Sequence, residues 1–204
     1  MVRAAPPKEL ETGALIDFLA DGWGLPVEAV HYAAVGAGSY HWIVNDAEGR
    51  CGFATADDLD LKPWLGDTRE SVFEGLSRSF GTAVALRNDG LGFVTAPIPT
   101  SSGETLRRFG SHYTVALFPF VAGQAGTFDH YETAERAALL AMLAQLHQAT
   151  PVVASAARTV DLGVPGRGRL ETALQELNQT WVGDLSPSPR GKRSPRTPPT
   201  WASC

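Results

Sequence analysis

Hydrophobic residues near the start of the chain recur at steps of three and four, which predicts an amphipathic helix. The positions that form this pattern are Leu10, Leu15, Ile16, Phe18 and Leu19. Gly22 and Gly24 follow, and glycine commonly ends a helix because it adopts the left-handed backbone conformation without strain. The first predicted element is therefore a helix that these two glycines close.

Three short apolar segments come next, over 30–35, 42–45 and 51–56. Each has the length of a strand, and glycine occurs in both connecting turns, 36–39 and 46–49. Strands joined by such tight turns pair with their neighbours in antiparallel order. The pattern predicts a three-stranded antiparallel meander, followed by a helix.

This second helix is predicted over 68–80. Asp67 or Thr68 is suited to its N-cap, because a short side-chain oxygen can accept hydrogen bonds from the first free amides. Gly81 is predicted to end the helix.

Two further strand candidates lie at 92–98 and 113–121, separated by a turn-rich segment over 99–110. Pro119 has no amide donor, which favours a sheet edge or the exit of a strand at that position. Together with the meander, these strands predict a five-stranded antiparallel sheet with one crossing helix, and hence an α+β fold.

The pattern after residue 122 favours helices. The strongest helical segment covers 131–147, where an apolar stripe from Leu139 to Leu146 indicates core packing, and Pro151 then breaks the helix. A weaker helix is predicted at about 169–178.

The final segment, 183–204, contains five prolines, four serines and four basic residues, and it has no apolar period. Such a segment buries too little apolar surface to offset the entropy of ordering it, so we expect a disordered tail. The predicted organisation is a strand-rich part over 1–122, a helical part over 123–182, and this tail.

Composition limits the possible partners and compartments. The 204 residues carry a net charge of -5, which argues against a nucleic-acid partner. The apolar run over 113–122 is about half as long as a membrane span, and the first residues lack the apolar core of a signal peptide. Two cysteines are too few for a zinc site or a disulfide scaffold, and the five histidines lack metal-ligand spacing. We therefore expect a cytoplasmic protein with no membrane partner and no metal ligands in this chain.

The turn with Gly36 and Gly38 is the most chemically suggestive motif. Glycines there would let backbone amides approach a phosphate closely, although many hairpins contain two glycines for conformational reasons alone. A dinucleotide-binding loop would need a third glycine at position 41, where this chain has His41, and a helix where the strand over 42–45 continues. A glycine loop between two strands is instead the arrangement of protein-kinase-like folds.

Several ordered motifs resemble the aminoglycoside phosphotransferase family, and most closely its actinobacterial, spectinomycin-phosphotransferase-like branch. The motifs are Val-Gly-Ala-Gly-Ser-Tyr-His-Trp at 35–42, Ala-Asp-Asp-Leu-Asp at 56–60, Lys-Pro-Trp-Leu-Gly at 62–66, Ala-Leu-Phe-Pro-Phe-Val-Ala-Gly at 116–123 and Leu-Ala-Gln-Leu-His-Gln-Ala-Thr-Pro at 143–151. The resemblance extends over about 8–182. It implies a protein-kinase-like N-terminal lobe, a hinge at 116–123, and the first helices of a C-terminal lobe. The implied activity is ATP-dependent phosphotransfer to a small-molecule hydroxyl, as in antibiotic resistance.

The resemblance also implies a nucleotide site, with ATP and Mg²⁺ as cofactors. Its residues would be Gly36, Gly38, Ser39, Tyr40, Thr55, Glu74, Phe118, Phe120 and Val121. The glycine turn would cover the phosphates, and the backbone of 118–121 would contact the adenine. Glu74 matches the position that usually pairs with a nucleotide-binding lysine. That lysine is missing, because Thr55 occupies its place, and a hydroxyl cannot replace an ammonium charge. Lys62 is the candidate to reach in from the following loop.

A second departure concerns the catalytic half. The family carries a His-Gly-Asp…Asn loop and a later metal-binding Asp, and neither pattern occurs after Pro151. We therefore expect a chain truncated before its catalytic loop and inactive as written, in which a frameshift or truncated gene produced 183–204. A genuine flexible tail is the alternative reading of that segment. A non-catalytic nucleotide-binding module and a non-functional fragment are the alternative functions, and the acceptor substrate stays open.

Overall fold

The computed structural model describes residues 3–123, 131–156 and 166–175. The chain divides into two compact units, of which the first contains every element from α1 to α4. The second unit contains helix α5 (Arg167–Gln175), which lies within the helix predicted at about 169–178 except for an earlier start. The predicted tail over 183–204 lies outside the described residues.

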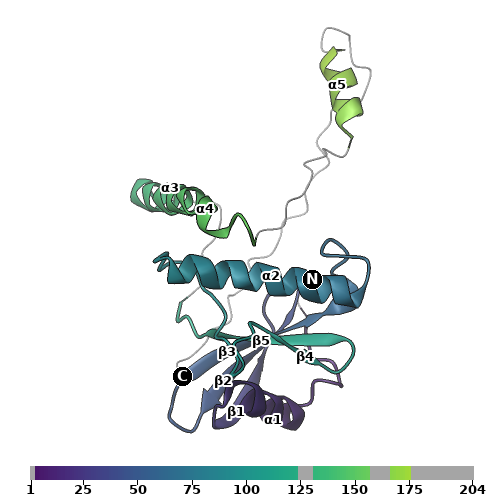
Figure 1. Ribbon diagram of the computed structural model, residues 1–204, viewed down its shortest axis with the longest axis vertical. Coiled ribbons are helices and arrows are strands. Elements are labelled where there is room, and N and C mark those ends of the chain that lie inside the picture. The colour runs from purple at the N-terminus through teal and green to yellow at the C-terminus, as the bar shows by residue number, and fades with distance from the viewer. Residues whose placement is uncertain (1–2, 124–130, 157–165, 176–204) are drawn as a thin grey trace, which may run out of the picture. The chain divides into compact units, whose positions relative to one another are not determined.

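Within the described residues, five strands form one antiparallel sheet (Figure 1). The strands are β1 (Val27–Ala33), β2 (Tyr40–Asp46), β3 (Cys51–Asp58), β4 (Arg107–Phe109) and β5 (Tyr113–Pro119). Their order across the sheet is β1-β2-β3-β5-β4. The predicted meander and the predicted five-stranded antiparallel sheet are confirmed, and Pro119 lies at the exit of its strand.

The fourth strand is not the predicted one. Within the predicted strand over 92–98, Ile98 forms an isolated bridge to Leu117, while the preceding residues form a turn and irregular backbone. Pro97 has no amide to donate to a ladder, which weakens strand formation there. The actual fourth strand, β4, lies in the segment predicted to be turns. Its Arg-Arg-Phe sequence has no apolar period from which a strand could be predicted. Arg107 and Arg108 form ion pairs with carboxylates instead of packing in a core.

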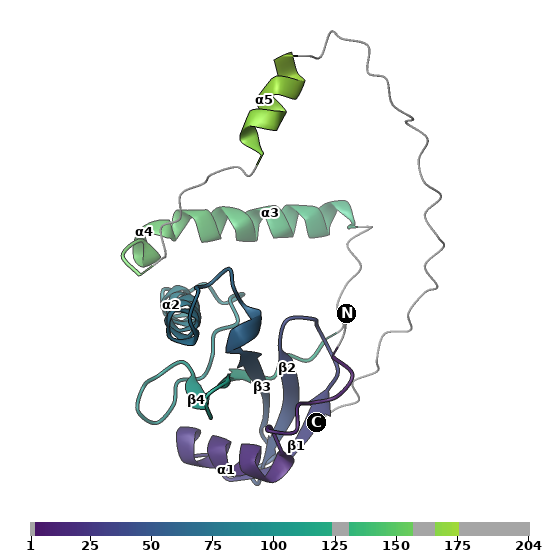
Figure 2. The ribbon, with the colours of Figure 1, turned by 90° about the vertical axis from the view of Figure 1, so that its right-hand side faces the viewer.

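Helices lie on opposite faces of the sheet (Figure 2). Alternate residues of the central strands pack against them. Helix α1 (Thr12–Trp23) covers one face and ends at Gly24 in the left-handed conformation, as predicted. The core on that face contains Leu15, Leu19, Trp42, Val44, Ala54, Ala56, Val115 and Leu117. Helix α2 (Arg69–Asn88) packs on the other face, where the core contains Leu59, Val72, Leu76, Leu106 and Ala116.

Helix α2 begins as predicted but extends past its predicted end. Thr68 is the N-cap, and its hydroxyl accepts a hydrogen bond from the Ser71 amide. The helix continues through Gly81 to Asn88. A glycine inside a helix costs about 1 kcal/mol relative to alanine. Burial of Leu86 in the last turns offsets that cost, because it packs in a cluster with Val153.

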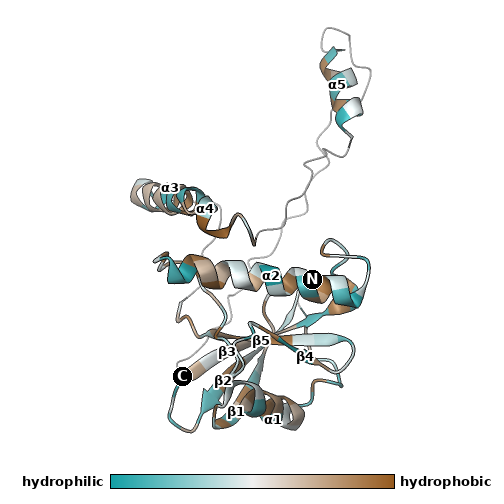
Figure 3. Ribbon diagram, in the orientation of Figure 1, coloured by the Kyte–Doolittle hydropathy of each residue, from teal (hydrophilic) through white to brown (hydrophobic). Residues whose placement is uncertain are grey.

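The helix predicted over 131–147 is present as α3 (Thr133–Gln148). Its predicted core face is exposed, however: Leu143 is 51% exposed and Leu139 is 39% exposed. Within the described residues, this face does not pack in a core. Pro151 lies in the first turn of a short apolar helix, α4 (Thr150–Val153), which contacts α2 (Figure 3). In the described residues, every helix is too short or too polar to cross a membrane.

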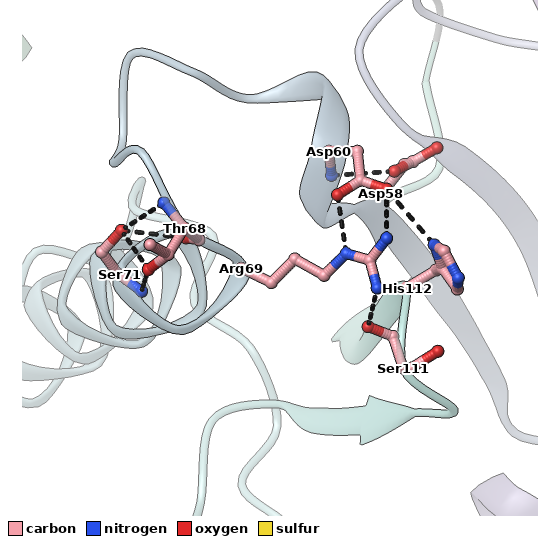
Figure 4. Close-up of polar contacts among 7 residues, drawn as sticks. All are labelled: Asp58, Asp60, Thr68, Arg69, Ser71, Ser111 and His112. Atoms are coloured by element: carbon pink, nitrogen blue, oxygen red, sulfur yellow. Dashed lines mark hydrogen bonds and ion pairs between the residues drawn. The ribbon is translucent and has the colours of Figure 1, made fainter.

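An ion-pair network joins the start of α2 to the loop after β3 (Figure 4). Arg69 donates from Nε and Nη2 to the two carboxylate oxygens of Asp60, at 2.6 and 2.7 Å, and from Nη1 to the Ser111 carbonyl. The His112 ring lies 3.2 Å from Asp60. These contacts attach α2 to the 3-10 turn over Leu59–Leu61 and to the β4–β5 turn.

Acid is expected to weaken this network. The hydrogen bonds from Arg69, and then from His112, lower the pKa of Asp60 from 3.8 to about 2. Because the folded-state pKa is lowered, the stabilisation is fully present above about pH 4 and is lost as pH falls towards 2. Urea unfolding at pH 6 and pH 3 should show a smaller acid-induced loss for Asp60→Asn than for the natural chain. The control Asp17→Asn, at an exposed position of α1, should show the same acid-induced loss of unfolding free energy as the natural chain. Equal losses for Asp60→Asn and Asp17→Asn would contradict this prediction.

Candidate functional site

The glycine turn between β1 and β2 has a conformation that requires glycine at one position. Gly36 has a φ of +69°, a region that residues with a side chain rarely adopt. A Cβ at Gly36 would lie 3.4 Å from the His41 Nε2 atom. At Gly38, a Cβ would meet no described atom within 4 Å, so the backbone there borders open space. The turn can therefore present its backbone to a ligand, and Gly36 sets its shape.

A buried cation lies against this turn. Lys62 Nζ is 2.8 Å from Asp57 Oδ1, 3.3 Å from the Gly38 carbonyl oxygen and 3.4 Å from Ser39 Oγ. The Ser39 hydroxyl donates a hydrogen bond to the same Asp57 oxygen. Lys62 is 7% exposed and Asp57 is 3% exposed. We call Ser39, Asp57 and Lys62 the Lys62 cluster.

The local fold explains how a residue beyond β3 reaches the glycine turn. Asp57 points to the same face of β3 as Thr55, because side chains two residues apart share a face. The chain then turns back through the 3-10 helix at Leu59–Leu61, where the Asp58 carboxylate accepts a hydrogen bond from the Asp60 amide (Figure 4). The Leu59 amide donates to the His112 carbonyl, which fixes this turn to the start of β5. Lys62 follows directly and returns to the sheet.

His41 extends the polar face from the Lys62 cluster along β2 and β3. The strand register places His41 opposite Thr55, and His41 Nδ1 lies 3.2 Å from the Thr55 hydroxyl. The imidazole stacks on the Phe53 ring, with centroids 5.1 Å apart. Burial lowers the pKa of His41 below 6.5; Asp57 raises this pKa, and Lys62 lowers it further. The ring is therefore neutral at neutral pH and offers one donor and one acceptor.

The titration of His41 provides a test of this environment. Because the folded-state pKa is lowered, its contribution to stability is fully present above pH 6.5 and is lost as pH falls through the folded-state pKa. In an NMR titration, the ring protons of His41 should shift with a midpoint below 6.5. The variant His41→Gln removes the signal and so assigns it. A midpoint above 6.5 would show that Asp57, and not burial, dominates.

The structure separates the predicted turn residues into two groups. Gly36, Gly38 and Ser39 form the turn beside the Lys62 cluster, and Thr55 lies on the same face of the sheet. Tyr40 lies on the opposite face, where its ring stacks edge-on with Tyr113 and the Arg3 guanidinium covers it. Side-chain alternation along β2 causes this separation.

The Glu74 side chain is exposed and forms its ion pair within its own helix. It is on α2, and its carboxylate pairs with Arg78 at 3.5 Å, with both side chains more than half exposed. The residues that α2 turns inward are apolar, including Val72 and Leu76. The buried cation at the turn therefore has Asp57 as its carboxylate partner, and Glu74 pairs with a different cation.

The predicted hinge residues lie at the end of β5. Phe118 pairs in register with Phe53, and its ring packs edge-on against Phe80 of α2, with centroids 5.5 Å apart. Phe120 follows the last residue of the strand and is half-buried, while Val121 is 67% exposed. The backbone at 120–121 thus directly follows the strand whose Phe118 pairs with Phe53.

Sequence reasoning did not assign His41 or Asp57 to the site, and it named Lys62 only as a candidate. The alternation of β3 could have found Asp57, since it lies two residues after Thr55. The pairing of His41 with Thr55 depends on the register of β2 and β3, which the sequence pattern alone leaves open. Over 3–123, 131–156 and 166–175, no group of three or more His, Cys, Asp or Glu residues could hold a metal ion.

Comparisons with known proteins define the fold. No protein-family model and no curated protein sequence matches the chain. Among solved structures, it is similar to the spectinomycin phosphotransferase APH(9)-Ia in complex with ADP and spectinomycin, with a TM-score of 0.56 and 13% sequence identity, over 86% of this chain and 49% of that chain. The AMP-bound complex of the same enzyme gives a TM-score of 0.54 and 15% identity, with the same coverage. The amicoumacin kinase hAmiN, in complex with AMP-PNP, Ca²⁺ and Ami, gives a TM-score of 0.54 and 14% identity, over 86% and 56% of the two chains.

The chain therefore has the α+β, protein-kinase-like fold of the N-terminal lobe of aminoglycoside phosphotransferases, as its motifs predicted. It spans about half the length of the structures that it matches. At this level of sequence identity, the likeness defines the fold, and the function has to be argued from the site.

Proposed function

We propose that this chain binds the nucleotide of an ATP-dependent phosphotransferase that acts on a hydroxyl group of a small molecule. The observation that carries the proposal is the glycine turn between β1 and β2, with a buried cation against it, in a kinase-like lobe. Three of the solved structures similar to this chain are complexes with ADP, AMP or AMP-PNP, which supports a nucleotide as the ligand.

The residues of the lobe fit the parts of a nucleotide. Backbone amides of the glycine turn are suited to phosphate oxygens, since the backbone at Gly38 borders open space. The Lys62 ammonium adds positive charge beside them. The hinge backbone at Phe120 and Val121 would contact the adenine, as the family resemblance implies.

A bound ATP would supply the phosphoryl group that the acceptor hydroxyl receives. The part of the chain that the structure describes has no cluster suited to Mg²⁺, so we derive no step through that ion. What these residues can do is bind and orient the phosphate chain. The transfer step is a proposal for the whole enzyme, with a cytoplasmic location and a small-molecule acceptor as further predictions.

Nucleotide binding tests the proposal directly. Isothermal titration of the purified chain with ADP and with ATP should give saturable binding at a single site. Affinity that rises when Mg²⁺ is added would favour the phosphotransferase over a non-catalytic nucleotide-binding module. Absence of saturable binding at millimolar nucleotide would contradict the proposed function.

A glycine substitution can separate the contribution of the turn to nucleotide binding from its contribution to the stability of the fold. Gly36→Ala forces a side chain into the φ region near +69° and is expected to lower ADP affinity about tenfold, because the displaced turn loses amide contacts worth on the order of 1.4 kcal/mol. Gly49→Ala is the matched control, since Gly49 has a φ of +79° in the other turn of β2. Both variants should lose similar unfolding free energy, while the control should keep its affinity within about twofold. Equal affinity losses would argue against a role for the Gly36 turn.

A further inference from the structure

We propose that Lys62, positioned by Asp57, binds the phosphates of the nucleotide in place of the lysine that β3 lacks. This inference rests on the proposed function and names the cation and the carboxylate of that site. The ligand class is a nucleoside di- or triphosphate, bound through its phosphate oxygens.

The three polar contacts of Lys62 differ in a way that suits phosphate binding. Among the described residues, its short contact is the 2.8 Å ion pair with Asp57, while its contacts with the Gly38 carbonyl and the Ser39 hydroxyl are longer, at 3.3 and 3.4 Å. An ammonium group has three N–H donors. Phosphate oxygens at the glycine turn can replace the two long contacts with charge-assisted hydrogen bonds, which are shorter and stronger. Asp57 meanwhile keeps the ammonium in place.

Burial of the pair favours a binding role over a stabilising one. Lys62 and Asp57 are both less than a tenth exposed, and removal of two charges from water is costly. Replacement of a buried ion pair by neutral groups of similar shape is often neutral or stabilising, so a pair of this kind adds little net stability. A hydrogen bond from this ammonium to a phosphate oxygen is stronger than the same bond in water, because the local dielectric is low.

Among the described residues, Lys62 is the cation that contacts the glycine turn on this face of the sheet. His41 on β2 is neutral at neutral pH, and Ser39 and Thr55 contribute hydroxyls. The carboxylate of Glu74 pairs with Arg78 instead of Lys62. The functional pair of this lobe is therefore Lys62 with Asp57, both from one short segment at the end of β3, and not a strand lysine with a helix glutamate.

The test compares ligands with and without phosphates. ADP and adenosine are titrated calorimetrically into the full chain, into the double variant Asp57→Asn/Lys62→Met, and into Lys8→Met as a matched control at an exposed lysine. The double variant removes both charges together, so no buried carboxylate is left unpaired. Circular dichroism verifies that each variant is folded. As a second measurement, Lys62→Arg keeps the charge but changes its geometry.

In the natural chain, ADP should bind more tightly than adenosine. The double variant should lose about tenfold to a hundredfold in ADP affinity and keep its adenosine affinity within about twofold, as expected for the loss of charge-assisted hydrogen bonds. Lys8→Met should behave as the natural chain, and Lys62→Arg should show an intermediate ADP affinity. The inference is overturned, with the proposed function intact, if the folded double variant keeps the natural preference for ADP. A natural chain that binds neither ligand overturns both.

Discussion

Replacement of Trp42 with alanine is expected to lower the free energy of unfolding by about 3–5 kcal/mol, the range for removal of a buried aromatic side chain. Trp42 is 2% exposed and is among the largest fully buried side chains of the lobe. It lies in the middle of β2, on the face that α1 covers, and its ring stacks edge-on with Tyr32 of β1, with centroids 5.4 Å apart. Its truncation leaves a cavity between the sheet and α1, where neighbours fixed in strands cannot move to fill it.

The measurement is urea unfolding monitored by circular dichroism. Tryptophan fluorescence is unsuitable as the signal, because the substitution itself removes a tryptophan. Trp64→Ala is the matched control, because Trp64 is 65% exposed. The centroid of its ring lies 5.7 Å from Lys62 Nζ. That variant should lose less than about 1 kcal/mol, as is usual for exposed positions. Similar losses for the two variants would contradict the assignment of Trp42 to the central core.

The sequence was most informative where local pattern and tertiary packing agree. Helix α1 has an apolar period and ends at Gly24, as predicted, although Gly22 lies inside the helix and Leu10 precedes it. The meander of β1, β2 and β3 has short apolar segments and glycine turns, and its pairing follows from the turn lengths. These elements also place the glycine turn correctly, because it depends on its two flanking strands.

Prediction failed where a distant partner decides the local structure. Gly81 ends no helix, because burial of Leu86 beside α4 is worth more than the cost of one glycine. The Arg-Arg-Phe segment forms a strand because β5 supplies the ladder partner, and a polar sequence of three residues carries no signal of that pairing. Both outcomes depend on contacts between residues far apart in the sequence.

The candidate site was predicted only in part, because some of its contacts also join residues far apart in the sequence. The glycine turn is visible in consecutive residues, and the resemblance indicated that Thr55 stands where relatives have a lysine. Whether Lys62 reaches the turn depends on the 3-10 turn after β3, which the Asp58 carboxylate and the His112 carbonyl hold. The face on which Tyr40 lies follows from strand alternation, which a motif alone does not reveal.

Removal of Lys62 alone is expected to be among the most destabilising single changes in the lobe. Lys62→Met leaves the Asp57 carboxylate buried, with its Ser39 hydrogen bond but without a counter-charge. Loss of one partner of a buried ion pair costs about 3–5 kcal/mol of unfolding free energy. Asp57→Asn should cost a similar amount, because it leaves the ammonium group unpaired among neutral groups.

The double variant Asp57→Asn/Lys62→Met should recover most of that loss, because neither buried charge is then left without its partner. A double-mutant cycle by urea unfolding at pH 7 measures the recovery as a coupling free energy, expected to exceed about 2 kcal/mol in favour of the pair. Asp17→Asn provides a matched aspartate control, since Asp17 is exposed on α1, away in the sequence from the Lys62 cluster. It should show a coupling with Lys62→Met below about 0.5 kcal/mol. Additive losses at Asp57 and Lys62 would show that the buried pair is not formed in solution, and the phosphate role of Lys62 would then lose its geometric basis.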